Sequence, residues 1–386
     1  MKPPEFYEGR EQTYLKHFFL EKYLERVAYN ILSFRNEFVF VDGFAGPWKS
    51  SNDALEDTSF VIALDQLRKI KDAKETQGKT AEMRCFFNEK NSTAFRELRK
   101  AAQSVTDIAV TATCQDFEEL VPEIIRFIGK SFSLTFIDPT GWTGFSLNMI
   151  EPLLRLPGEA LINLMFDHVN RFIESPNSTT AKSLDALFGD SDWYQEVERK
   201  CMEGEDREDA ILAVYCERIR TSGNFEHVTS TRVLKPLSDR SYFHLIYATR
   251  HWKGLVEFRN VEKQAIDEQE RVRDGAKLAS KVAHTGQTEM FGTESGRVGP
   301  PSYAQKRTRQ LELAATKARR LIAGAGVVKY EALLGEILEM PLVWESDIKA
   351  WLQDWVRDGT IRLPDLRGRE RTPKTGHDLV WAATYE

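Results

Sequence analysis

Two hydrophobic patterns alternate along the first half of the chain. Short apolar runs lie at 38–42, 83–89, 108–116, 134–139 and 160–166, and a longer stretch with helical spacing follows each of them. A further amphipathic helix is predicted over residues 11–34, before the first run. Because the short runs are too apolar to face water, the alternation predicts a parallel sheet covered by helices on both faces.

The second half of the chain departs from this rhythm. Residues 167–225 are polar and helical, which favours an insertion or a cap, and residues 229–251 predict two late β-segments. A long charged helix is predicted over 255–283. Residues 284–303 are rich in Gly, Ser, Thr and Pro, which is typical of a linker. We therefore expect a domain at 1–283, a linker at 284–303 and a second domain at 304–386.

The expected second domain has its own pattern of three helical stretches followed by two strands around a basic, turn-rich loop. This order is typical of a winged helix-turn-helix. Its last part carries five cations against two acids: Arg362, Arg367, Arg369, Arg371 and Lys374. A basic wing of this kind would lie along nucleic-acid phosphates without reading sequence. The alternatives are a solvated hairpin and a wing that docks on another protein.

Composition narrows the classes of protein. A net charge of −6 argues against a wholly basic nucleic-acid coat protein. The four cysteines are scattered without a CxxC pair, so we expect free thiols in a reducing cytoplasm and no metal site. We see no secretory signal and no apolar run long enough to span a bilayer.

The first predicted strand ends in the sequence VDGFAGPW, which indicates a ligand-binding loop. Asp42 ends the strand, and Gly43, Phe44 and Gly46 follow it. In open α/β sheets ligands bind at the carboxyl ends of the strands, and glycines let the backbone approach a ligand closely. A tight strand-to-loop turn is the simpler alternative, and Trp48 stands where a third glycine would complete such a loop.

Polar residues at the ends of the next strands strengthen the ligand-site interpretation. Glu89 is placed to accept ribose hydroxyls, and Asp116 with Phe117 to bind and cover an adenine. Glu89 is alternatively a solvated residue at a helix start, and Asp116 a helix N-cap. Asp138 and Pro139 end the fourth strand within Asp-Pro-Thr-Gly-Trp, which brings an acid, a turn and an aromatic residue together.

With these residues in view, the chain resembles the class I S-adenosyl-L-methionine (SAM)-dependent methyltransferases. It resembles more closely the bacterial three-Cys-motif partner family, TcmP. The resemblance covers about the first 260 residues and rests on Lys16-His17, Tyr23, DGFAGP at 42–47, FFNEKN at 86–91, FIDPTGW at 136–142, and the stretches 163–171 and 242–254.

The resemblance implies a Rossmann-like sheet of seven strands that binds SAM, with an α-helical insertion. It matches Asp42, Gly43 and Gly46 to the methionine-side loop. It also matches Asp138-Pro139 to the motif that holds an exocyclic base amine. Two residues depart from the family pattern: Trp48 replaces a glycine, and Thr140 stands where an aromatic is favoured, so Trp142 would have to supply the stacking ring.

Two functions follow from these predictions. The first is a SAM-dependent methyltransferase, or a SAM-binding homologue, that acts on an exocyclic amine of DNA or RNA. The second is a degenerate, non-catalytic accessory subunit that recruits nucleic acid or a three-cysteine-motif partner of the iron–sulfur or radical-SAM type. Trp48 and Thr140 favour the second function.

Overall fold

The structure, a computed structural model, describes residues 1–46, 55, 57–173, 178–285 and 303–382. Its centre is a seven-stranded sheet with the order β3-β2-β1-β4-β5-β7-β6. The strands are β1 (Glu37–Asp42), β2 (Glu82–Asn88), β3 (Ala109–Thr113), β4 (Ser133–Ile137), β5 (Gly158–Leu164), β6 (His227–Leu234) and β7 (Ser241–Thr249). Strands β1–β5 are parallel, and β7 runs antiparallel to both β5 and β6. The predicted parallel sheet and the two late β-segments are confirmed.

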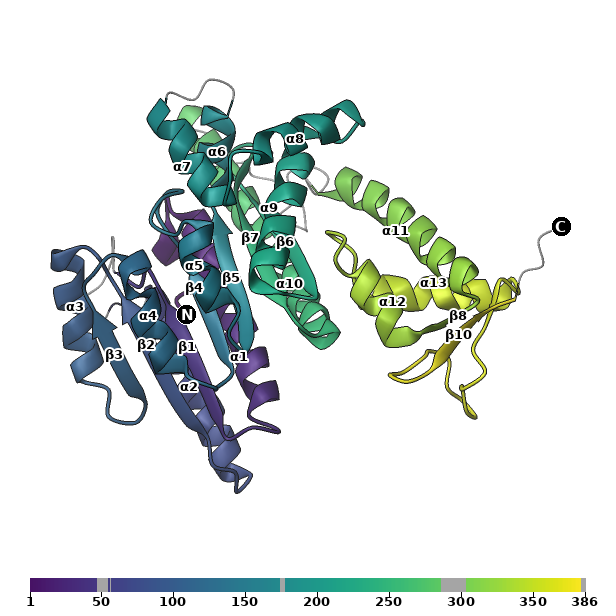
Figure 1. Cartoon of the computed structure of the whole chain (residues 1–386), viewed down its shortest axis with the longest axis horizontal. Coiled ribbons are helices and arrows are strands. Elements are labelled where there is room, and N and C mark those ends of the chain that lie inside the picture. The colour runs from purple at the N-terminus through teal and green to yellow at the C-terminus, as the bar shows by residue number, and fades with distance from the viewer. Residues whose placement is uncertain (47–54, 56, 174–177, 286–302, 383–386) are drawn as a thin grey trace.

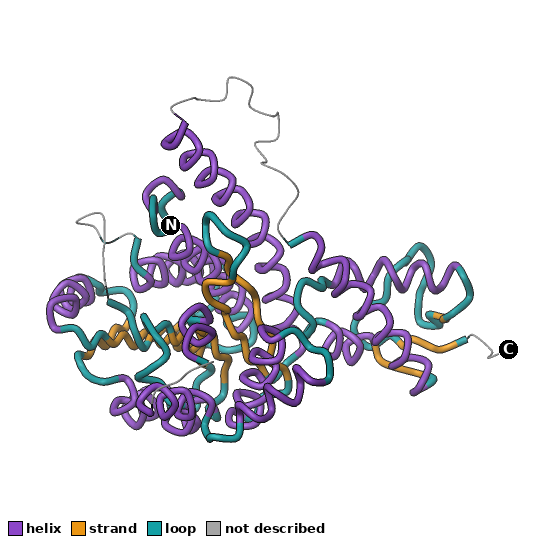
Figure 2. The backbone as a smooth tube through the Cα atoms, turned by 90° about the horizontal axis from the view of Figure 1, so that it is seen from above, coloured by secondary structure: helices purple, strands orange, loops and turns teal. Residues whose placement is uncertain are grey.

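Helices cover both faces of this sheet, as Figure 2 shows from above. Alternate strand residues divide between two hydrophobic cores because side chains along a strand point to opposite faces. One core packs against α1 (Glu11–Ile31), α2 (Ser59–Thr76), α3 (Ser92–Gln103) and α10 (Trp252–Thr285). The other packs against α4 (Phe117–Ile128), α5 (Leu147–Leu154) and α9 (Arg207–Gly223). The long charged helix predicted at 255–283 is confirmed as α10.

The segment predicted as an insertion or cap, 167–225, divides into two parts. Helices α6 (Phe166–Phe172), α7 (Ser178–Phe188) and α8 (Trp193–Met202) gather beyond the end of β5 (Figure 1). Helix α9 instead packs against β6 and α5 as one of the covering helices, because its residues Ile211, Tyr215 and Ile219 are buried in the second core. A short 3₁₀ helix, η1 (Pro4–Tyr7), precedes α1.

The C-terminal unit occupies the opposite end of the long axis from β3 (Figure 1). Its elements are α11 (Ala304–Ala325), β8 (Val327–Lys329), α12 (Tyr330–Ile337), α13 (Glu345–Arg357), β9 (Ile361–Arg362) and β10 (Asp378–Trp381). The strands form an antiparallel sheet with the order β8-β10-β9. The three predicted helices and the two predicted strands are present. The short strand β8 was not predicted, because its three residues read as the start of the following helix.

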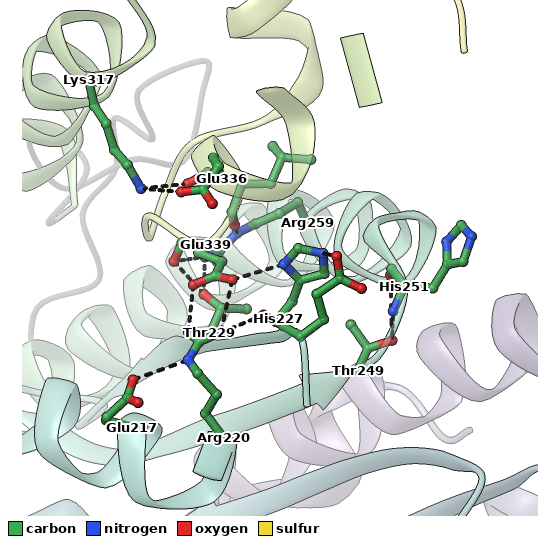
Figure 3. Close-up of polar contacts among 12 residues, drawn as sticks. Glu217, Arg220, His227, Thr229, Thr249, His251, Arg259, Lys317, Glu336 and Glu339 are labelled. Atoms are coloured by element: carbon green, nitrogen blue, oxygen red, sulfur yellow. Dashed lines mark hydrogen bonds and ion pairs between the residues drawn. The ribbon is translucent and has the colours of Figure 1, made fainter. Parts of the chain in front are cut away.

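A polar cluster joins the C-terminal unit to the large sheet, and Figure 3 shows it in close-up. The Glu339 carboxylate, which follows α12, accepts from Arg220 Nη2 at 2.7 Å and lies 2.9 Å from His227 Nδ1. The Glu339 carbonyl accepts from the Thr229 hydroxyl at 2.7 Å, and the buried Arg259 donates to the carbonyl of Leu338 at 2.8 Å. Partners from α9, β6 and α10 therefore hold a single turn of the C-terminal unit.

Three further observations concern the whole chain. Residues 286–302, most of the predicted linker, lie outside the described residues. Within the described ranges no helix is both long and apolar enough to cross a membrane. The four cysteines are free thiols, of which Cys85 is buried.

Candidate functional site

A cavity of about 420 Å³ opens at the carboxyl ends of β1, β4 and β5. Its walls come from six separate parts of the chain: α1 and its N-cap, the loop after β1, the start of α2, the loop after β4, the end of β5, and the start of β7. Its described lining residues are Arg10, Gln12, Thr13, Lys16, His17, Phe44, Gly46, Asp57, Thr58, Ser59, Asp138, Pro139, Thr140, Asn163, Met165, Tyr242 and Phe243. The cavity lies at the edge where open α/β sheets bind their ligands.

Asp42 lies directly beneath this cavity, at the end of β1. Its side chain is fully buried and accepts from the Phe44 amide at 3.0 Å and from the Ser59 hydroxyl at 2.7 Å. Burial raises the pKa of the Asp42 carboxyl to about 7, although both hydrogen bonds act in the opposite direction. A carboxyl of this kind sits close to the boundary between its neutral and charged forms at physiological pH.

Neighbouring side chains leave no space for a side chain at either glycine of the loop. A Cβ atom at Gly46 would lie 1.8 Å from Glu89 Oε2, and one at Gly43 would lie 2.5 Å from the Phe117 ring. Neither approach leaves room for a larger residue. The glycines therefore let the loop lie flat against the end of β2, with Gly46 exposed to the cavity.

Asp138 is the acidic group that lines the cavity after β4, and two neighbours fix its orientation. Lys16 Nζ from α1 lies 2.5 Å from Asp138 Oδ2, and Asn163 Nδ2 from β5 donates to Oδ1 at 2.7 Å. Asn163 follows Ile162, which pairs with Ile137 in the parallel ladder, so strand register places the amide beside the carboxylate. The lysine reaches the same point because α1 packs against this face of the sheet.

A second charged group lines the α1 side of the cavity. Arg10 Nη2 lies 2.9 Å from Asp57 Oδ2, whose side chain is fully buried. His17 lies beside them, 3.3 Å from the Tyr7 hydroxyl through Nδ1. Burial, and then the neighbouring Lys16 cation, lower the pKa of His17 to about 3, so its imidazole is neutral at physiological pH.

The residues predicted to bind the adenosine part of a cofactor do not line the cavity. Glu89 is buried beside Gly46 and accepts from the Asn91 amide at 2.5 Å. Asp116 precedes α4 but makes no cap hydrogen bond; it pairs with Lys90 at 2.5 Å on the surface. The Phe117 ring is buried against Phe44, with ring centroids 5.1 Å apart, beneath the glycine loop.

Of the two tryptophans noted in the sequence, Trp142 does not line the cavity. Trp142 donates from Nε1 to the Ser183 hydroxyl at 2.9 Å and packs edge-on against His168. It therefore faces α7 and α6, whereas Thr140 is exposed and lines the cavity. Trp48 lies outside the described residues.

The five basic residues predicted to contact phosphates are all exposed on β9 and the loop after it. Lys374 pairs with Glu370. Within residues 303–382, the side chains of Arg362, Arg367, Arg369 and Arg371 make no ion pair. These four cations are available to an anionic surface.

Sequence reasoning did not assign Gln12 or Asn163 to the site, although both line the cavity. The signal for Asn163 was an amide in the otherwise apolar run ALINLMF, close to the carboxyl end of a strand. Gln12 offered no such signal, because a polar residue in the first turn of a surface helix is ordinary. Lys16 was noted as part of the family resemblance, but its pairing with Asp138 depends on how α1 packs.

Comparisons with known proteins leave the family open. No protein-family model and no curated protein sequence matches the chain. Protein LPL1258 from Legionella pneumophila, of the family-model DUF519, superposes with a TM-score of 0.38 at 9% identity, covering 65% of this chain and 91% of that one. Loganic acid methyltransferase with SAH superposes with a TM-score of 0.28 at 10% identity, covering 71% and 90%. Both scores are too low to bear on function.

Proposed function

We propose that the chain is a SAM-binding, methyltransferase-like protein that acts on an exocyclic amine of a nucleic-acid base, and that it is related to the TcmP family. The observation that carries this proposal is a single cavity that joins the glycine loop after β1 to Asp138 after β4. The seven-stranded sheet with a reversed β7 supports it, since the resemblance implies a sheet of this size.

The residues around the cavity fit the proposed cofactor. Gly43 and Gly46 bring the loop backbone to the cavity edge without side chains, and Asp42 lies beneath them as a buried acceptor. Glu89 is buried behind Gly46, and its carboxylate accepts from the backbone amides of Asn91 and Gly46. A carboxylate offers about four lone-pair sites, so Glu89 retains capacity for ribose hydroxyls.

SAM supplies an electrophilic methyl group, so the chain's own contribution is positioning. Lys16 and Asn163 hold the Asp138 carboxylate in one orientation, facing the cavity. Asp138 then accepts an N–H of the amine and aligns its nitrogen. The neutral His17 and the paired Arg10 shape the opposite wall without adding an unpaired charge.

The proposed nucleic-acid partner rests on the C-terminal unit. Its order, helix–strand–helix–helix–strand–strand, supports a winged helix-turn-helix in which the segment 363–377 is the wing. Four unpaired arginines on β9 and this wing give it a local positive charge on a chain of net −6. Phosphate contacts of this kind fix position and do not read sequence.

Calorimetry and a transfer assay test the proposal together. S-adenosylhomocysteine (SAH) should bind the wild-type protein, and Asp138→Ala should keep that binding while losing methyl transfer from labelled SAM to unmethylated DNA or RNA. Transfer that survives Asp138→Ala would show that the amine site is elsewhere. Absence of SAH binding would overturn the proposed cofactor.

One observation favours the accessory-subunit function instead. Trp142, the aromatic residue expected to stack on a base, is held by Ser183 and His168 away from the cavity. Under this alternative the fold is a scaffold that recruits nucleic acid or an iron-containing three-cysteine-motif partner. A stoichiometric iron protein co-purified from the native host would favour it, and a lone active monomer would exclude it.

A further inference from the structure

Two buried hydrogen-bond acceptors without a partner belong to residues that line the same cavity. They are Asn163 Oδ1 and Gln12 Oε1, and within the described part of the chain no donor reaches either of them. The other buried side-chain atoms without a partner in this part of the chain are all nitrogens. Buried polar groups are normally satisfied, so two such acceptors in one cavity need an explanation.

The orientation of the Asn163 amide is fixed by its neighbour. Its Nδ2 group donates to Asp138 Oδ1 at 2.7 Å, and a carboxylate can only accept there. Turning the amide over would place oxygen against oxygen, so Oδ1 is the atom left without a partner. Asn163 is only 1% exposed, so the bulk solvent reaches this atom poorly.

Three donors that line the cavity are already engaged elsewhere. Lys16 pairs with Asp138, Ser59 donates to Asp42, and Thr58 donates to the Leu55 carbonyl at 2.6 Å. These three groups do not satisfy Asn163 Oδ1 or Gln12 Oε1, and the N–H donors of a ligand in the cavity would.

We propose that Asn163 Oδ1, Gln12 Oε1 and Asp138 form a subsite for an amino or ammonium group. Such a group brings two or three N–H donors, which matches several acceptors in one cavity, whereas a hydroxyl brings one hydrogen. A phosphate or carboxylate brings none and would be repelled by Asp138. This inference deepens the proposed function and rests on it for the identity of the ligand. The group belongs either to the methionine part of the cofactor or to the base that receives the methyl.

Two leucine variants and paired ligands test the subsite. Gln12→Leu and Asn163→Leu remove the acceptors, Gln12→Glu keeps an acceptor, and Asn148→Leu is the matched control outside the cavity, where Asn148 donates to the Gly189 carbonyl at the surface. Calorimetry compares SAH with 5′-methylthioadenosine, which lacks the amino-acid part. With SAH saturating, it then compares adenosine with inosine and cytidine with uridine, in which a carbonyl replaces the amine.

Two results support the subsite and assign its source. If the leucine variants lower the affinity for SAH at least tenfold and leave the affinity for 5′-methylthioadenosine unchanged, the group is the cofactor's ammonium. If they leave the affinity for SAH unchanged, lower the affinity for adenosine or cytidine at least tenfold, and leave the affinity for inosine and uridine unchanged, the group is the base amine. In both cases Gln12→Glu should retain most of the affinity lost in Gln12→Leu.

The contrary results are equally distinct. Unchanged affinity for every ligand in both leucine variants overturns the subsite, as does equal weakening of the amino and carbonyl nucleosides. Gln12→Leu should also melt no lower than wild type, because the unpaired acceptor contributes nothing to the fold. If SAH fails to bind the wild type, the proposed cofactor is wrong, and the nucleoside pairs, run without SAH, then decide the subsite alone.

Discussion

Gly46 shows how closely the loop after β1 is fitted to its surroundings. A Cβ atom there would lie 1.8 Å from Glu89 Oε2, so Gly46→Ala must displace either the carboxylate or the loop. We expect a loss of roughly 1–3 kcal/mol in unfolding free energy, as for other overpacked sites, and weaker SAH binding. Denaturant unfolding and calorimetry measure the two effects.

Gly141→Ala is the matched control, because a Cβ atom there meets nothing within 4 Å. It should change neither stability nor SAH affinity. If Gly46→Ala behaves like Gly141→Ala, the close fit between Gly46 and Glu89 does not matter for the loop.

Asp42 makes stability depend on pH. Burial raises its pKa from 3.8 to about 7, so the folded protein holds a proton that the unfolded chain has already released. Stability is therefore lost as the pH rises between these values. Asp42→Asn removes this loss. The unfolding free energy of Asp42→Asn relative to wild type should therefore rise between pH 4 and pH 8 by up to about 4 kcal/mol, since each pKa unit corresponds to about 1.4 kcal/mol.

Urea unfolding of both proteins at pH 4 and pH 8 gives this difference. Asp65→Asn, which replaces a half-exposed carboxylate on α2, is the control. A difference between Asp42→Asn and wild type that stays the same at both pH values would contradict the raised pKa of Asp42.

At the scale of elements, the exposed arginines around the β9–β10 wing carry the expected contact with nucleic acid. Replacing Arg367, Arg369 and Arg371 by alanine removes three unpaired cations. Affinity should fall similarly for all sequences. The slope of log K against log salt should become shallower by about 2–3, because each phosphate contact contributes about 0.7–0.9.

Fluorescence anisotropy over a range of salt concentrations measures this slope. Arg199→Ala, which removes a paired cation on α8, is the control and should leave the slope unchanged. A triple variant with wild-type affinity and slope would show that the wing has another role, such as docking on a protein.

Elements with a clear hydrophobic pattern could be predicted from the sequence. Features that depend on packing between distant segments could not. Strands β1, β2, β4 and β5 follow apolar runs, and α10 follows a long helical pattern. Strand β8 was missed because three residues carry no period. In the site, the position of Asp138 followed from its place after a strand, but its partner Lys16 and the direction of Trp142 depend on packing between distant segments.

At the scale of the molecule, Glu339 ties the C-terminal unit to the large sheet (Figure 3). Burial raises the pKa of its carboxyl, but hydrogen bonds from His227 and Arg220 outweigh burial and leave the pKa below its ordinary value. Glu339→Gln weakens these charged hydrogen bonds and should lower unfolding free energy by about 1–3 kcal/mol. Hydrogen exchange should also become faster in β6 and α12.

Glu336→Gln, on α12 just before Glu339, is the control, since within the described residues the Glu336 carboxylate pairs with the exposed Lys317 of the same unit. Its effect should stay within about 0.5 kcal/mol. Equal effects of the two variants would mean that the cluster around Glu339 does not hold the two units together.

The central claim is that the cavity between the glycine loop and Asp138 binds SAM. Calorimetric titration of SAH into the wild-type protein and into Gly46→Trp tests it most directly, because a side chain at Gly46 collides with Glu89 and must displace the loop that borders the cavity. The account predicts one-to-one binding to wild type and none to a folded Gly46→Trp. Absence of heat with the wild type, together with an unchanged melting temperature in SAH, would contradict it.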